Sequence, residues 1–237
     1  RAADGKGPVK PDAARPQAED YLRMLHGKDP APDAIDAMDK YLVTVSDHGM
    51  NASTFTARVV ASTAAEQVSS VLAALCALKG PLHGGAPGPV LDMLDDIGGA
   101  QNIEPWLREA VMAGDRLMGF GHRIYRVRDP RADVLGAAIE NLKGVEERTA
   151  FARQVEATAK AVLKELKPHR PLDTNVEFYT ALLLEALAIP REAFTPTFAV
   201  GRVAGWTAHV MEQEATGRLI RPSARYVGKL PDDLEVA

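Results

Sequence analysis

One stretch decides the fold: Val71–Gly85, which reads VLAALCALKGPLHGG. Its first eight residues are nearly all apolar, a run that predicts a buried helix with the lone cysteine, Cys76, packed on one face. Gly80-Pro81 then ends the helix. His83 follows among glycines, which let backbone and ligand approach closely. The stretch therefore predicts a buried helix that leads into a histidine-bearing binding site.

Helical spacing of apolar residues extends over most of the chain. From Ala18 it predicts two helices, one around Tyr21–Leu25 and one over Ile35–Val45, and Ser53 and Thr54 are the predicted caps of the next helix. Further helical patterns cover residues 90–97, 104–113, 132–142, 147–166, 177–187 and 198–214. Strand signals are confined to 123–127 and 225–227, which are too short to found a sheet. The sequence therefore predicts an all-α fold, preceded by a mobile lead-in over residues 1–16.

Composition narrows the class of partner. The 237 residues are 46% hydrophobic and 25% charged, as in a soluble globular protein. The 28 basic and 32 acidic side chains leave a net charge of -4 without the clustered basic face that nucleic acid or anionic lipid would require. No run is long enough for a membrane span, and the N-terminus lacks a signal-peptide core. The charge balance leaves small molecules as the expected partners. A single cysteine favours a reducing compartment, so the expected location is cytoplasmic.

A second glycine-flanked histidine, His122, lies in Gly119–Tyr125. This segment has no third glycine and no long preceding strand, so it does not predict dinucleotide binding. The other groups that could carry chemistry are His48, Glu177 and the arginines at 126, 131, 202 and 221. His209, two turns after Arg202, fits a packed core histidine better than a site residue.

These side chains favour an anionic substrate over a metal. The histidines are too far apart for a compact ligand motif, and the chain has no His-Glu-x-x-His or Cys-x-x-Cys pair, so no metal site is expected. Guanidinium groups bind carboxylates bidentately, and imidazoles donate hydrogen bonds to carbonyl oxygens. The combination suits a ketodiacid.

Five segments resemble motifs of the citrate synthase family, in the family's order. They are Asp47–Thr54, Gly80–Ala86, Gly119–Tyr125 with Asp129–Arg131, Asn175–Tyr179 and Arg218–Pro222. The likeness runs from about Tyr21 to Gly228 and corresponds to the C-terminal two-thirds of a family member, with the N-terminal helices absent from this chain. It implies two helical domains with the active site in the cleft between them. The large domain would comprise residues 1–83 and 189–237 and the small domain residues 84–188, closing by a hinge near the His83 loop.

The resemblance implies an acyltransferase of the tricarboxylic acid cycle. It would condense acetyl-CoA with oxaloacetate and hydrolyse the thioester to give citrate and CoA, with the CoA thioester as co-substrate and no other cofactor. His83 matches the neutral histidine that donates a hydrogen bond to the thioester oxygen as the enolate forms. His122 matches the histidine that polarises the oxaloacetate carbonyl. Glu177 occupies the position of the base that takes a proton from the acetyl methyl carbon.

The resemblance also implies binding roles. Arg131 and Arg202 match the arginines that hold the oxaloacetate carboxylates, and His48 adds a hydrogen bond. Gly119, Phe120 and Gly121 resemble a backbone turn against the CoA adenine, and Arg126 matches an arginine near the CoA phosphates. Arg221 matches an arginine that the family supplies across a subunit interface, which implies a homodimer.

Three departures from the family pattern leave alternatives open. Glu177 stands where the family usually has Asp, Val45 replaces a frequent histidine, and Pro87-Gly88 replaces a usual Asn-Glu. A misplacement of about 1 Å can cost on the order of 10²-fold in rate. One alternative is a 2-methylcitrate synthase using propionyl-CoA, because one methylene changes binding by only about 1–3 kcal/mol. Another is a non-catalytic homologue that binds CoA or a protein partner.

The extent of the chain leaves a further alternative, that it is only a fragment of the coding sequence. We expect the chain to be part of a full-length protein. The face that the absent N-terminal helices would cover would be apolar and prone to aggregation if it were left exposed.

Overall fold

The computed structural model describes residues 5–80, 83–84, 87–121, 129–170 and 172–228. These residues form helices and no strand, which confirms the predicted all-α class; the one β-contact is an isolated antiparallel bridge between Phe120 and Thr174. The α-helices are α1 (Gln17–His26), α2 (Pro32–Val45), α3 (Ala52–Ala61), α4 (Gln67–Leu78), α5 (Pro87–Ile97), α6 (Ile103–Ala113), α7 (Pro130–Glu140), α8 (Glu146–Leu166), α9 (Val176–Ala186) and α10 (Phe194–Thr216). Two 3-10 turns, η2 (Ala100–Asn102) and η3 (Arg191–Ala193), precede α6 and α10.

The helices lie where the apolar spacing predicts them, but the cap of α3 differs. Asn51 is the N-cap, and its side-chain oxygen accepts hydrogen bonds from the backbone N–H groups of Ser53 and Thr54. The prediction that Ser53 and Thr54 are the caps was therefore wrong, because the carbonyl of Asn51 already reaches the free donors of the first turn. Residues 225–227 form no strand, and the predicted strand at 123–127 lies outside the described residues.

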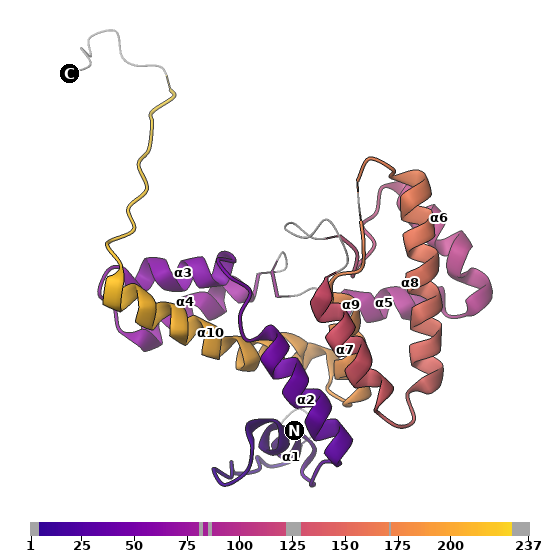
Figure 1. Ribbon diagram of the computed structural model, residues 1–237, viewed down its shortest axis with the longest axis horizontal. Helices are drawn as coiled ribbons and strands as arrows, with labels where there is room; N and C mark the ends of the chain where they lie inside the picture. Colours follow the sequence, from indigo (N-terminus) through magenta and orange to yellow (C-terminus); the bar gives the residue numbers. More distant parts are fainter. Residues whose placement is uncertain (1–4, 81–82, 85–86, 122–128, 171, 229–237) are drawn as a thin grey trace.

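Two groups of helices are joined through α2 and α10 (Figure 1). In one group α3, α4 and α10 pack against one another, and α10 also packs on α2, which packs on α1. In the other group α6 packs on α8, and both α7 and α5 pack on α9. Helix α2 links the groups through its contact with α7, and the buried apolar residues of both groups form one continuous core. The division into domains at residues 83 and 189 stays a prediction.

Helix α10 approaches the end of α2 closely because two glycines face it. A Cβ on Gly201 would lie 2.6 Å from Val45 Cγ2, and a Cβ on Gly205 would lie 2.1 Å from the Ser46 carbonyl oxygen. The adjacent Trp206 is almost completely buried. Only glycine allows this spacing, so the start of the 46–51 loop is held directly against α10.

Helix α4 does not fulfil the prediction of a fully buried helix. Ala74 and Leu78 are buried, but Val68 and Leu72 are 64% and 54% exposed, and Cys76 is exposed as well. These three exposed residues recur every four positions and so share one face of the helix. Among the described residues only one side of this helix is covered, and Val68, Leu72 and Cys76 form an exposed apolar stripe on the other side.

Beyond α10 the chain becomes extended and leaves the body of the molecule (Figure 1). Near its start the tail is tied to the protein by two hydrogen bonds, from the Gln213 side chain to the Arg218 carbonyl oxygen and from the Ile220 N–H to Ser62 Oγ. No helix in the described part of the chain has the length and apolar character needed to span a bilayer.

We expect Gly205→Ala to lower the free energy of unfolding by about 1–3 kcal/mol, since the backbone of the 46–51 loop would have to move to admit a methyl group. The melting temperature measured by circular dichroism should fall by about 2–10 °C. Gly88→Ala is the matched control, because nothing lies within 4 Å of a Cβ built there. Equal melting temperatures for the two variants would contradict the close approach.

Candidate active site

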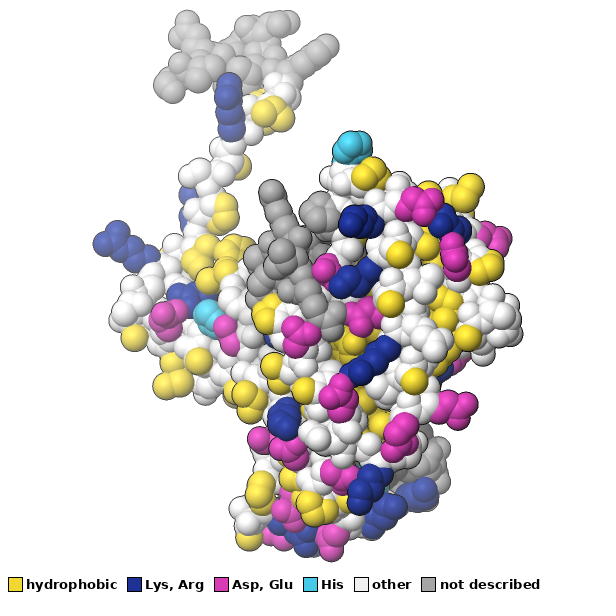
Figure 2. Space-filling view, turned by 45° about the vertical axis from the view of Figure 1, so that its right-hand side comes forward, with side chains coloured by type: hydrophobic (Ala, Val, Ile, Leu, Met, Phe, Trp, Pro, Cys, Tyr) yellow, Lys and Arg dark blue, Asp and Glu magenta, His cyan; other side chains and the backbone are white. Residues whose placement is uncertain are grey.

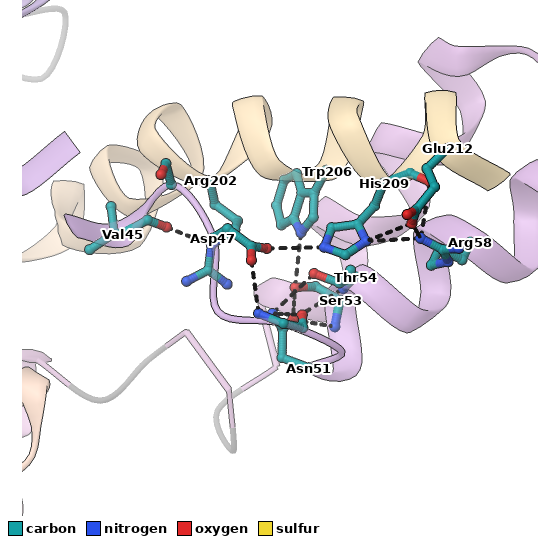
Figure 3. A network of polar contacts seen from close by, with 12 residues as sticks. Val45, Asp47, Asn51, Ser53, Thr54, Arg58, Arg202, Trp206, His209 and Glu212 are labelled. Atoms are coloured by element: carbon teal, nitrogen blue, oxygen red, sulfur yellow. Dashed lines mark hydrogen bonds and ion pairs between the residues drawn. The ribbon is translucent and has the colours of Figure 1, made fainter. Parts of the chain in front are cut away.

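The loop between α2 and α3 is stabilised by a chain of polar contacts from α10 and α3. Asp47 accepts hydrogen bonds from the Gly49 N–H (3.0 Å) and from His209 Nε2 (3.1 Å). Arg58 contacts the other ring nitrogen, Nδ1, at 3.0 Å and also pairs with Glu212 (Figure 3). A guanidinium can only donate, so Nδ1 is the acceptor and Nε2 carries the hydrogen.

This chain of contacts determines the charge state of Asp47, the residue before His48. Desolvation alone would raise the pKa of Asp47, but the hydrogen bonds from Gly49 and His209 outweigh it and lower the pKa. Asp47 is therefore ionised at neutral pH. The prediction that His209 is a packed core histidine was wrong, because its ring lies half-buried in a polar network with Asp47 and Arg58.

His83 contacts the first turn of α3, which follows this loop, through Ser53. Its Nε2 lies 2.9 Å from Ser53 Oγ, a fully buried hydroxyl that also accepts a hydrogen bond from Trp206 Nε1 at 3.1 Å. Burial lowers the pKa of His83, and the nearby positive charge of Arg202 lowers it further. The imidazole is therefore neutral at physiological pH.

Ser53 controls which nitrogen of His83 carries the proton. The hydroxyl proton can go to Asn51 Oδ1 at 2.7 Å or to His83 Nε2. Asn51 Oδ1 already accepts two backbone N–H groups, which fill its two lone pairs. A proton directed to His83 Nε2 places the ring hydrogen on Nδ1. In this arrangement the neutral ring can donate a hydrogen bond to a ligand.

Arg202 is the buried cation of the site. Only 2% of its surface is exposed, its Nε donates to the Val45 carbonyl oxygen at 2.6 Å, and its guanidinium carbon lies 4.7 Å from the centre of the Phe198 ring. Burial, with the repulsion of Arg131, lowers its pKa to about 10. The side chain remains charged at neutral pH and suits an anionic ligand.

Arg131 is oriented by the residue that caps its helix. The fully buried Asp129 accepts the Arg131 backbone N–H and forms a bidentate pair with its guanidinium, at 3.0 and 2.7 Å. Asp129 also accepts the Val176 N–H at 3.3 Å. One carboxylate thus fixes Arg131 relative to the start of α9.

Glu177 lies in the first turn of α9, where the Asn175 side chain accepts its backbone N–H at 3.0 Å. The side chain keeps a partly exposed surface but is surrounded by protein. Desolvation raises its pKa to about 7, against the opposing charges of Arg131 and Arg202 and with a further upward contribution from Asp129. A carboxyl group with this pKa can exchange protons near neutral pH.

Two contacts on Glu156 support the segment that carries Glu177. This buried carboxylate of α8 accepts hydrogen bonds from Thr174 Oγ1 and Tyr179 Oη, each at 2.6 Å. Both hydroxyls flank Glu177 in the sequence. The sequence analysis did not identify Glu156, because a charged residue on a long amphipathic helix is usually on the solvated face.

The turn at Gly119–Gly121 lies against the same segment. Both glycines have positive φ, and a Cβ on Gly119 would lie 2.9 Å from Phe178 Cβ. The Asn175 N–H donates to the Gly119 carbonyl oxygen and the Gly121 N–H to the Asp173 carbonyl oxygen, at 2.9 and 2.7 Å. Phe120 is buried edge-on against Phe178. The turn is therefore positioned by the protein, and its contact with CoA stays a prediction.

The predicted site residues do not all lie together. His83, Glu177 and Arg131 are each close enough to Arg202 for its charge to act on them. His48 lies half-buried in the loop beside Asp47. Arg221 lies exposed on the C-terminal tail and is not part of this cluster. His122 and Arg126 lie outside the described residues.

Several residues of the site were absent from the sequence prediction. They are Asn51, Ser53, Trp206, Arg58 and Asp129. Ser53 and Asp129 contact the predicted residues His83 and Arg131 directly, whereas Asn51 and Trp206 contact Ser53, and Arg58 contacts His209. A signal existed for two of them: Asn51 precedes a helix, and Asp129 precedes Pro130 at a helix start. Within the described ranges no group of three or more His, Cys, Asp or Glu side chains could hold a metal ion.

Acidic and basic side chains are interspersed on the face shown in Figure 2, with no large area of one sign. The fold and the site together define an all-helical protein with a half-buried site for an anionic ligand, containing a neutral histidine and a carboxyl group with a pKa of about 7.

Comparison with known proteins gives the family. Residues 1–223 match the family described as "Citrate synthase, C-terminal domain", so the chain belongs to the citrate synthase family. A protein of Mycobacterium tuberculosis (strain ATCC 25618 / H37Rv) is 47% identical over 203 residues, 86% of this chain and 54% of that relative. Citrate synthase 2 of Bacillus subtilis (strain 168) is 41% identical over 228 residues, 96% of this chain and 60% of that protein.

A solved structure is similar throughout the chain. It is the ternary complex of carboxymethyl coenzyme A and oxaloacetate with citrate synthase from Thermoplasma acidophilum, with a TM-score of 0.85 and 32% identity over 96% of this chain and 61% of that one. The chain therefore spans between one half and two-thirds of the length of these relatives.

Glu177→Gln should stabilise the protein at alkaline pH. Folding raises the pKa of the Glu177 carboxyl from 4.5 to about 7. The buried carboxyl therefore costs no stability below pH 4.5, where it is protonated in both states, and the free energy of unfolding falls as the pH rises from 4.5 to about 7. The variant has no charge to bury and should be more stable than wild type near pH 8 by up to about 3 kcal/mol, with little difference near pH 4.

Urea unfolding across this pH range measures the difference. The exposed Glu214→Gln is the matched control and should follow wild type at every pH. A stability difference between Glu177→Gln and wild type that does not change with pH would contradict the buried carboxyl.

Proposed function

We propose that the intact protein condenses acetyl-CoA with oxaloacetate and hydrolyses the resulting thioester to citrate and CoA. What supports this proposal is that the charge of the buried Arg202 acts both on a neutral His83 and on a Glu177 with a pKa of about 7. The family match and the ligands named for the Thermoplasma acidophilum complex support the same substrates.

The described residues suit the first proton transfer. Ionised Glu177 takes a proton from the methyl carbon of acetyl-CoA, and electron density moves to the thioester oxygen. His83 donates a hydrogen bond to that oxygen from Nδ1, provided that Ser53 donates to Nε2. Because the ring is neutral, it stabilises the developing charge without transferring its proton in advance.

Arg131 and Arg202 suit the second substrate. Oxaloacetate carries two carboxylates, and a buried guanidinium binds such a group strongly and with fixed geometry. The enol carbon then attacks the oxaloacetate carbonyl carbon, and water subsequently displaces CoA as its thiol. In this proposal His48 adds a hydrogen bond to oxaloacetate and His122 polarises its carbonyl.

The proposal needs no metal or organic cofactor, because the CoA thioester is a co-substrate. The turn of Gly119, Phe120 and Gly121 would contact the adenine of CoA, with Arg126 near its phosphates. The helices between residues 84 and 188 would close over the bound substrates as the small domain, excluding water before the enolate forms. The cytoplasm remains the expected location.

The intact wild-type protein should release CoA when given oxaloacetate with acetyl-CoA, faster than with propionyl-CoA. Thiol release monitored with a chromogenic disulfide measures both rates. Glu177→Gln should lose at least about 100-fold in turnover, because the amide cannot accept the methyl proton.

Three outcomes separate the alternatives. Equal or faster turnover of propionyl-CoA would establish the 2-methylcitrate synthase alternative. No turnover with either thioester, restored by Glu177→Asp, would establish the non-catalytic homologue. Turnover of acetyl-CoA by the wild-type protein eliminates the non-catalytic alternative.

We also propose that the protein acts as a homodimer in which Arg221 enters the partner's site. The exposed stripe of Val68, Leu72 and Cys76 on α4 supports an interface on this face. Ile220, next to Arg221, is bonded to Ser62 just beyond the C-terminal end of α3, whereas Ser53 lies at the N-terminal end of that ten-residue helix. The two ends of α3 are about 15 Å apart, which favours Arg221 serving a second subunit.

Two inactive variants should therefore complement each other. Arg221→Ala and Glu177→Gln each remove one group from every site of a homodimer, but their heterodimer has one complete site. After denaturation and refolding of an equal mixture, we expect about a quarter of wild-type turnover, since half of the dimers are mixed and each has one working site.

Leu72→Glu placed in both chains should abolish this recovery by separating the subunits. Met112→Glu, on the exposed surface of α6, should leave it intact. Recovery at the level of the separate variants would contradict a shared site.

A further inference from the structure

The hydroxyl of Thr195, in the first turn of α10, is bonded to the loop that carries His83. It donates a hydrogen bond to the carbonyl oxygen of Gly84, the residue after His83, at 2.9 Å. A threonine in a helix usually bonds a carbonyl of its own preceding turn, as Thr197 does with Ala193 at 2.7 Å. Thr195 instead reaches a residue 111 positions away in the sequence, so its bond is a tertiary contact.

The same loop is tied to α4 on its other side. The N–H of Gly84 donates to the carbonyl oxygen of Leu78, the last residue of α4, at 3.0 Å. A Cβ on Gly84 would lie 2.5 Å from that oxygen, so the approach requires glycine. Gly84 is buried, and both polar groups of its backbone therefore need partners inside the protein. Helix α4 accepts the N–H, and Thr195 of α10 donates to the carbonyl.

Helix α10 also holds the ring of His83. Trp206 Nε1 donates to Ser53 Oγ at 3.1 Å (Figure 3), and that hydroxyl lies 2.9 Å from His83 Nε2. Trp206 follows Thr195 by about three helical turns, so the two side chains share one face of α10. His83 is therefore connected to a single helix at two points: its backbone through Gly84 and its ring through Ser53.

We propose that Thr195 is a positioning residue for His83, and that its bond to Gly84 keeps the imidazole within reach of Ser53. A shift of the backbone at Gly84 moves the adjacent ring with it, and hydrogen-bond lengths extend only from about 2.7 to about 3.2 Å. Thr195 acts through the backbone and has no contact with substrate in this proposal. The catalytic consequence rests on the proposed function, whereas the effect on the ring does not.

The surroundings of the ring predict how it responds when this bond is lost. Burial lowers the pKa of His83, and the charge of Arg202 on α10 lowers it further, while Ser53 of α3 contributes a neutral hydroxyl. Removing the Thr195 hydroxyl alters none of these groups. A ring that moves away from Ser53 gains water, so its pKa should rise toward the usual value for histidine. It also loses the donor that keeps its hydrogen on Nδ1.

The test is 15N NMR of the histidine rings in the free, intact protein, with the His83 signals assigned by His83→Asn. Thr195→Val preserves the shape of the side chain and removes the donor. It should raise the His83 titration midpoint above that of wild type and give a mixture of the two ring tautomers. Thr195→Ser keeps the hydroxyl and should match wild type in both respects. An unchanged midpoint and tautomer in Thr195→Val would overturn the proposal.

Thr197→Val is the matched control for a general loosening of α10. The Thr197 hydroxyl is fully buried and is bonded to Tyr21 Oη and to the Ala193 carbonyl oxygen, each at 2.7 Å. Its loss should lower stability at least as much as Thr195→Val does, but leave the His83 spectrum unchanged. A His83 shift of equal size in both valine variants would also overturn the proposal.

A second substitution keeps the test valid if Thr195→Val does not fold. Thr195→Ala removes the same donor without placing a methyl group against the Gly84 carbonyl oxygen. It should raise the His83 midpoint in the same direction, and a midpoint equal to that of wild type would again overturn the proposal.

Activity then separates this proposal from the proposed function. Thr195→Val should lower kcat about 10- to 100-fold, because the hydrogen bond from His83 to the thioester oxygen would be misplaced, and Thr195→Ser should restore most of the loss. A wild-type protein inactive with both thioesters, but with a His83 midpoint that Thr195→Val shifts, would refute the proposed function and retain the positioning role. An active wild type whose kcat and His83 spectrum match those of Thr195→Val would refute the positioning role alone.

Discussion

The buried charge of Arg202 is the interaction on which the rest of the site depends. A guanidinium that is 2% exposed loses most of its hydration, and the hydrogen bond and ring contact that hold it, to the Val45 carbonyl and the Phe198 ring, are with neutral groups. Burial lowers the pKa of His83 and the charge of Arg202 lowers it further, while the same charge partly offsets the desolvation of Glu177. The same charge leaves the site ready for an anionic ligand, which would supply the countercharge.

Buried polar side chains fix the orientation of the other residues of the site. Asp129 binds Arg131 at two points and the start of α9 at a third, while Glu156 binds hydroxyls on both sides of Glu177. Ser53 connects His83 to α10 through Trp206. Each of these supports is buried, so the hydrogen bonds are protected from competition by water.

Sequence patterns predicted the helices well, because the apolar period of each helix is a local property that packing reinforces. They also predicted that the helix before His83 ends near Gly80, and α4 ends at Leu78. They failed for α4: an apolar run shows that a face avoids water, but not whether the same chain or another subunit covers it. They failed for the cap of α3 as well, where Ser53 and Thr54 were predicted and the structure has Asn51.

The sequence by itself determined the helical class, the order of the motifs and the residue types available for chemistry. Only the tertiary structure decided which side chains meet: it brings Ser53 of α3 and Trp206 of α10 together with His83, across more than a hundred residues of chain. It also decided their protonation. The pKa of a side chain depends on burial and on neighbouring charges, and neither can be known before distant segments have packed.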